Sequence, residues 1–195
     1  MTRRTVSLLV ETDPHWVEGI LDNFPAFLQD HANCERKASA LALSMVVKYP
    51  DRTTIIPDLI ALAREELEHF EEVYRVMNRK GILLAKDEPD PYINGLLKAM
   101  RHGRQQRFID RMLVSSLVEC RGAERFRLVA DAIDDEELGS FYHRLWKSEQ
   151  KHGNQFIRLL LKEAVDEREV MNRAEELAQV EADLVLSLPQ RAALH

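Results

Sequence analysis

The stretch AREELEHFEEVY, residues 63–74, contains the pattern Glu-x-x-His, and the stretch SEQKHGNQF, residues 148–156, repeats it. A further glutamate precedes each pattern, 31 residues before the first and 30 residues before the second. Nearly equal separations are expected if each glutamate and its pattern belong to one helical hairpin. The six residues of this repeat are Glu35, Glu66, His69, Glu119, Glu149 and His152.

This repeat is the ligand set of a ferritin-like dinuclear metal site, in which two helices each give one Glu and two others each give Glu-x-x-His. Because three residues along a helix span nearly one turn, the Glu and the His of each pair project from the same side and can bind one ion. Two divalent ions would balance four carboxylates in a core, where uncompensated charge is costly. The mixed carboxylate and imidazole ligands favour iron, with manganese as the second choice.

Apolar residues recur at helical spacing, so the sequence predicts a mostly helical chain. Pro25, with Asn23 as a possible cap, indicates one helix start, and Gly81 indicates one helix end. We predict an all-α, ferritin-like four-helix bundle with a long crossover between helices 2 and 3 and extra peripheral helices, in a single domain over 1–195. The core bundle should span about 25–165, with helices over about 25–49, 57–78, 105–133 and 137–164, a short helix over about 92–100 and a C-terminal helix over about 167–187.

The apolar face of each predicted bundle helix includes its candidate ligands, so we expect all six side chains in the core. Glu72 falls off that face and is interpreted as solvated. His31 lies on the face one turn before Glu35, and we expect it to hydrogen-bond a ligand rather than to bind metal. A peripheral helix should turn one apolar side inward, formed by Val170, Leu177, Val180 and Leu184.

Small residues surround Glu119 on its predicted helix and follow His152 on the next. They indicate either room for an organic substrate or only close packing of helices. From composition alone, three uses of a diiron site stay open: iron oxidation and storage, peroxide or superoxide handling, and attack of O2 on a C–H bond. The small residues are Ser115, Ser116, Gly122, Ala123 and Gly153.

The formal net charge of −6 argues against nucleic acid as a general partner. If four glutamates are buried on metal, however, the remaining surface is nearly neutral and permits local basic patches. No apolar run approaches the length of a membrane span and the N-terminus has no secretory signal, so we expect a cytoplasmic protein. Cys34 and Cys120 form neither a disulfide framework nor a Cys-x-x-Cys pair, and we expect both to be small buried hydrophobes.

Four strings carry a resemblance to a known family: HANCERKASALAL around Glu35, AREELEHFEEVY around Glu66, LVSSLVECRGAERF around Glu119 and SEQKHGNQF around Glu149. In them the chain resembles the tRNA-(2-methylthio-N-6-isopentenyl adenosine)-hydroxylase family. The resemblance covers nearly the whole chain from about Leu9 onward, and ECRGAERF is not expected in ferritins or rubrerythrins. All six metal positions match the family's ligand pattern.

The resemblance implies an O2-dependent, non-haem diiron monooxygenase that hydroxylates the prenyl group of a modified adenosine beside the tRNA anticodon. O2 is then the co-substrate, and an electron-transfer reductase must supply two electrons, since no flavin or nicotinamide motif is visible. No catalytic residue beyond the metal ligands is expected. The substrate is the tRNA anticodon loop that carries the prenylated adenosine, and we expect a monomer.

A tRNA substrate requires cations that contact phosphates. The densest basic run holds Arg101, Arg104 and Arg107, and a smaller run holds Arg3 and Arg4. Such a run by itself is more often a solvated surface that keeps a protein soluble. Because the chain resembles a family that modifies tRNA, we interpret this run as a tRNA-binding site.

Two other interpretations stay open. One is a ferritin-like iron-oxidising or peroxide-handling redox protein, and the other is a metal-free helical bundle that acts as an interaction module. Iron analysis separates the metal-free bundle from the rest, and oxygen transfer to the nucleoside separates the hydroxylase from the redox protein.

Overall fold

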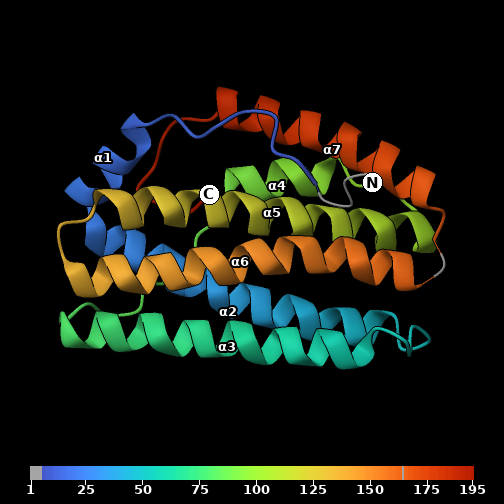
Figure 1. The fold of residues 1–195 in the computed structure, drawn as a ribbon, viewed down its shortest axis with the longest axis horizontal. Helices are drawn as coiled ribbons and strands as arrows, with labels where there is room; N and C mark the ends of the chain where they lie inside the picture. The colour runs from blue at the N-terminus through green and yellow to red at the C-terminus, as the bar shows by residue number, and fades with distance from the viewer. Residues whose placement is uncertain (1–5, 164) are drawn as a thin grey trace. The chain divides into compact units, whose positions relative to one another are not determined.

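The computed structural model describes residues 6–163 and 165–195. Over that part of the chain it contains seven helices and no strand, so the predicted all-α class is confirmed (Figure 1). Residues Arg3 and Arg4, the smaller predicted basic run, lie outside the described residues. The helices are α1 (His15–Asp22), α2 (Phe24–Lys48), α3 (Ile56–Arg79), α4 (Pro91–Lys98), α5 (Arg104–Ala132), α6 (Glu136–Lys162) and α7 (Glu167–Ser187).

Six of these helices agree with the predicted ones to within about two residues at each end. Helix α1 is not among the predicted helices. It has eight residues, so its apolar pattern covers only about two helical turns. No helix in the described part of the chain is long and apolar enough to cross a bilayer.

The contacts divide the chain into two compact units. Unit 1 takes in the described residues up to Glu18, Pro89–Arg191 and His195, and unit 2 takes in Gly19–Glu88 and Ala192–Leu194. The single domain over 1–195 stays a prediction.

Unit 2 is built on the hairpin of α2 and α3, which run side by side (Figure 1). The hydroxyl of Ser39 on α2 donates to the carbonyl of Ala63 on α3 at 2.7 Å. Gly81 has a φ of +69° and ends α3 as predicted, because the amide of Ile82 can then donate back to the Met77 carbonyl at 2.9 Å. Asn23 stands at the N-cap position of α2, but its side chain makes no capping hydrogen bond, so the expected cap is wrong in its chemistry.

Unit 1 is built on α5 and α6, which are antiparallel neighbours. Asp135 caps α6 by accepting from the amides of the first helical turn. Ser116 on α5 donates to the Gly153 carbonyl on α6 at 2.6 Å, and a β-carbon at Gly153 would come within 2.6 Å of the Cys120 sulfur. At these positions the small residues therefore serve close packing of the two helices.

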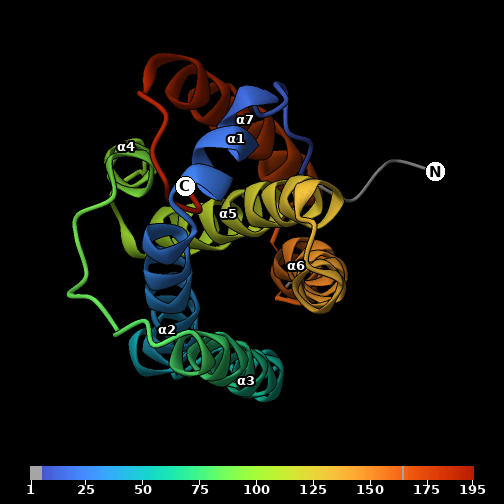
Figure 2. The ribbon, with the colours of Figure 1, turned by 90° about the vertical axis from the view of Figure 1, so that its left-hand side faces the viewer.

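Helices α4 and α7 contact α5 and each other within the same unit. Both lie above α5 in the end-on view (Figure 2). Val170 and Leu177 are buried, as predicted for the inner side of α7. Val180 and Leu184 are only half-buried, and the acidic residue Glu181 is buried in full. The spacing of apolar residues therefore predicted the wrong centre for the buried face of α7, because the charged side chain of Glu181 lies there.

Candidate metal centre

In unit 2, α2 and α3 bring Glu35, Glu66 and His69 together. All three are buried, and one ligand atom from each lies within 4.8 Å of the others. The Nδ1 atom of His69 is 3.3 Å from Oε2 of Glu66 and 3.8 Å from Oε2 of Glu35. The hairpin thus gathers two carboxylates and one imidazole at one point.

In unit 1, α5 and α6 bring together the matching set, Glu119, Glu149 and His152. One ligand atom from each again lies within 4.8 Å of the others. Glu149 and His152 are buried, whereas Glu119 is only half-buried, which differs from the expected burial of all six side chains. The Nδ1 atom of His152 is 3.3 Å from Oε2 of Glu149.

The two sets repeat one local geometry. In each Glu-x-x-His pair the imidazole Nδ1 faces the carboxylate Oε2 at 3.3 Å, because residues three apart on a helix share a side. Neighbouring ligand atoms of one octahedral ion, each about 2.1 Å from the metal, are about 3 Å apart. Two carboxylates and one imidazole form a donor set that suits iron or manganese. The residues of each set therefore fit one such ion.

His31 lies beside the first set. Its Nε2 atom is 2.7 Å from Oε1 of Glu35, and its ring stacks on Phe27 with centroids 5.9 Å apart. Because His31 is fully buried and held by this stacking, it can fix the orientation of the Glu35 carboxylate.

A second buried polar cluster lies in unit 1, centred on Arg121 of α5. Its guanidinium donates to Glu181 of α7 at 2.8 and 3.1 Å and to Thr12 at 3.1 Å, and it also pairs with Glu124. The hydroxyl of Tyr92 donates to Glu181 at 2.9 Å. Burial opposes the charged guanidinium, but the hydrogen bond and the charge of Glu181 outweigh it and raise the pKa of Arg121.

This cluster was not predicted from the sequence. The one signal for it is the string ECRGAERF, which places Arg121 two residues after a candidate ligand. Cys120, between them, is half-buried, and burial raises the pKa of its thiol to about 11, so at neutral pH it is an uncharged packing residue. Cys34 is also half-buried, and neither cysteine forms a disulfide.

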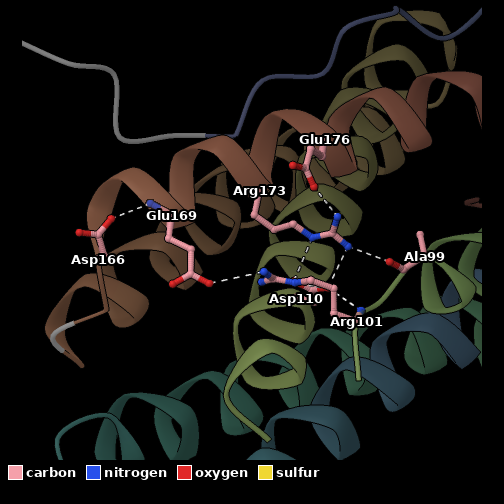
Figure 3. A network of polar contacts seen from close by, with 7 residues as sticks. All are labelled: Ala99, Arg101, Asp110, Asp166, Glu169, Arg173 and Glu176. Atoms are coloured by element: carbon pink, nitrogen blue, oxygen red, sulfur yellow. Dashed lines mark hydrogen bonds and ion pairs between the residues drawn. The ribbon is translucent and has the colours of Figure 1, made fainter. Parts of the chain in front are cut away.

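The predicted tRNA-binding run divides into two parts. Arg101 is held by the buried carboxylate of Asp110, which accepts from its backbone amide at 2.7 Å and from its guanidinium at 2.8 Å (Figure 3). Arg173 of α7 donates to the same carboxylate at 2.9 Å. Arg104 and Arg107 are exposed at the start of α5. Their contact with tRNA stays a prediction.

Comparison with known proteins gives concordant matches. The family model described as tRNA-(MS2IO6A)-hydroxylase (MiaE) matches residues 1–195. A tRNA 2-(methylsulfanyl)-N(6)-isopentenyladenosine(37) hydroxylase from Pseudomonas putida is 35% identical over 94% of this chain and 89% of its own length. The protein of the same description from Salmonella typhimurium is 28% identical over 94% of this chain and 85% of its own length.

A solved structure supports the fold. It is a Synechococcus protein with aldehyde deformylating oxygenase activity, 32% identical in sequence, with a TM-score of 0.90 over 96% of this chain and 94% of that chain. Its ferritin-like fold confirms the predicted fold class, a ferritin-like helical bundle with a long crossover and peripheral helices.

Proposed function

The chain belongs to the tRNA-(MS2IO6A)-hydroxylase family, and we propose that it hydroxylates the prenyl group of 2-methylthio-N6-isopentenyladenosine in tRNA as a non-haem diiron monooxygenase. The observation that carries this proposal is the pair of Glu, Glu, His sets, one in each hairpin, in a chain that matches the family model from end to end. We place the enzyme with its substrate in the cytoplasm, as a monomer.

Each set holds one iron ion in this proposal, with manganese as the second choice. Glu35, Glu66 and His69 form one set, and Glu119, Glu149 and His152 form the other. When bound, the two ions supply the activation of O2 that C–H hydroxylation requires. The reaction consumes O2, two electrons and two protons, places one oxygen atom on the prenyl group and releases the other as water. An external reductase supplies the electrons.

The protein's own residues supply geometry and a dry environment. The imidazole of His31 holds the Glu35 carboxylate in one orientation at 2.7 Å. Burial of Glu66, Glu149 and His152 limits the access of water to the reacting centre. The adenosine belongs to a single-stranded loop, so presenting its base costs little unpairing energy.

The decisive experiment measures oxygen transfer. The iron-loaded protein is chemically reduced and incubated with ¹⁸O2 and tRNA that carries the prenylated adenosine, and the nucleosides are then analysed by mass spectrometry. We expect one ¹⁸O atom in the modified nucleoside. Iron uptake and oxidation at full rate without tRNA, together with no labelled nucleoside, would favour the alternative of a ferritin-like iron-oxidising or peroxide-handling protein.

The same assay with an aldehyde in place of tRNA tests the activity named for the Synechococcus protein. We expect no deformylation, because the family match and both curated relatives specify a tRNA substrate. Deformylation without tRNA hydroxylation would refute the proposed substrate while keeping the diiron chemistry.

A further inference from the structure

Beyond its first turn, which has the exposed acids Glu136 and Glu137, helix α6 carries charge of one sign on its outer face. Between Leu138 and Lys162 it has five lysines and arginines and a single acidic residue, Glu149, which is buried. All five basic side chains are exposed. We call them the basic stripe: Arg144, Lys147, Lys151, Arg158 and Lys162.

The spacing of the basic stripe places its members in one line. Successive members are three, four, seven and four residues apart, so at 100° per residue all five fall within an arc of about 60°. The stripe runs over 18 residues, which is about 27 Å of helix. Glu149 and His152 project from a different side of the same helix, toward α5 and the metal-ligand set.

An ordinary solvated helix face mixes both signs, so that neighbours one turn apart attract each other. Helix α3 does so: Arg75 pairs with Glu71 at 2.6 Å on its exposed face. On α6 the neighbours one turn apart, such as Lys147 and Lys151, are both cations. A polyanion is the complement of such a row of like charges, and a solubility role does not require one sign in a chain whose net charge is −6.

We propose that the basic stripe binds consecutive phosphates of the tRNA substrate. This inference rests on the proposed function, because it names the surface that the same substrate uses. Phosphates are the charge complement of a line of exposed cations, and such contacts supply affinity without reading sequence. The stripe also lies on the helix that carries Glu149 and His152, so a strand held along it is anchored to the outer side of the helix that supplies these two ligands.

The test replaces three central members of the stripe, Lys147→Gln, Lys151→Gln and Arg158→Gln, in one variant. A matched control replaces three exposed cations, one in α3, one directly after α3 and one in α7, and has the same net charge: Arg64→Gln, Lys80→Gln and Arg168→Gln. Both variants are loaded with iron, and the Kd for the prenylated tRNA is measured at several salt concentrations. Single-turnover hydroxylation is followed with chemically reduced protein, so that no reductase takes part.

For the stripe variant we expect the Kd to rise roughly 10- to 100-fold at about 0.1 M salt, and the slope of log K against log salt to become shallower by about 2, since each lost phosphate contact removes about 0.7. At saturating tRNA, the single-turnover rate of hydroxylation should match that of the unmodified protein. The iron content should match as well. The control variant should bind tRNA within about twofold of the unmodified protein.

Equal Kd values for the stripe variant and the control would overturn the inference. A stripe variant that binds tRNA normally, but turns over slowly only when a protein reductase delivers the electrons, would also overturn the inference. The stripe would then be a docking site for an acidic protein. If the unmodified protein binds tRNA but never oxidises it, and the stripe variant binds tRNA more weakly than the control, the proposed function fails and the stripe inference stands. If the enzyme is active and the Kd of the stripe variant is unchanged, the stripe inference fails and the proposed function stands.

Discussion

Glu149 on α6 and Glu181 on α7 are both buried carboxylates of the same unit, and their surroundings differ in kind. Glu181 accepts from the guanidinium of Arg121 and the hydroxyl of Tyr92. Glu149 lies beside a second carboxylate, Glu119, and the imidazole of His152, with one ligand atom of each within 4.8 Å of the others. One acid is compensated by a cation that belongs to the chain, whereas the other stands in a group of metal-donor atoms.

The difference shows how a buried charge can be assigned a role. A carboxylate with an internal guanidinium partner stabilises the packing of its helices and is complete without a ligand. Carboxylates gathered with imidazoles repel one another until a cation binds between them, so they mark a metal site. Iron content and stability, measured on the same variants, separate these two roles.

The largest effect is expected at the ligands. Glu149→Ala should abolish iron binding in its set and lower hydroxylation by more than about 100-fold, since even residues that only orient a metal ligand cost 10- to 100-fold. Glu35→Ala and Glu119→Ala should behave alike, measured by iron analysis and single-turnover assay. Glu72→Ala on the exposed side of α3 is the control and should be nearly silent. Equal losses in all four variants would refute the distinction between the two helix faces.

Removal of the internal ion pair should act on stability instead. Glu181→Ala removes the carboxylate that compensates the buried guanidinium of Arg121. We therefore expect the free energy of unfolding to fall by about 4 kcal/mol. Urea unfolding measures this change. Iron per folded chain should stay normal. A variant that keeps its stability but loses iron would reverse the roles assigned to the two clusters.

A smaller effect, with a defined pH dependence, is expected at Asp110. Burial acts to raise the pKa of Asp110, but hydrogen bonds from Arg173 and Arg101 outweigh it and hold the pKa below the ordinary 3.8. Its carboxylate therefore stabilises the fold at pH values above about 3.8, and this contribution is lost as the pH falls through the folded-state pKa.

Asp110→Asn should accordingly lower the free energy of unfolding by about 2 kcal/mol at neutral pH. The gap between variant and unmodified protein should narrow as the pH is lowered below about 4, as measured by urea unfolding across that range. A gap that is independent of pH would show that packing, and not the charge of Asp110, is responsible.

The smallest effect is expected at His31, which supports a ligand and binds no metal in our proposal. His31→Ala removes the 2.7 Å contact to Glu35 and should weaken iron affinity by about tenfold. Competition with a chelator measures this shift. Complete loss of iron would instead make His31 a ligand, and no change would make it a packing residue beside Phe27.

Much of the fold followed from local pattern. Six helices were predicted near their observed bounds because the signals for a helix are local. Apolar periodicity, Pro25 and Gly81 each depend only on residues nearby in the sequence. The Glu-x-x-His pairs followed for the same reason, since one helical turn brings Glu66 to His69 and Glu149 to His152. Asn23 shows the limit of such reasoning: its position at the helix start is right, yet its side chain makes no cap.

The sequence by itself determined six of the seven helices in the described part of the chain and which acids stand with a histidine one turn away. Only the tertiary structure decided that Arg121 meets Glu181 across 60 residues and that Asp110 joins Arg101 to Arg173. The physical reason is range. Periodicity and turn chemistry are properties of neighbouring residues, whereas the compensation of a buried charge depends on which helices become neighbours in space, and no local pattern encodes that.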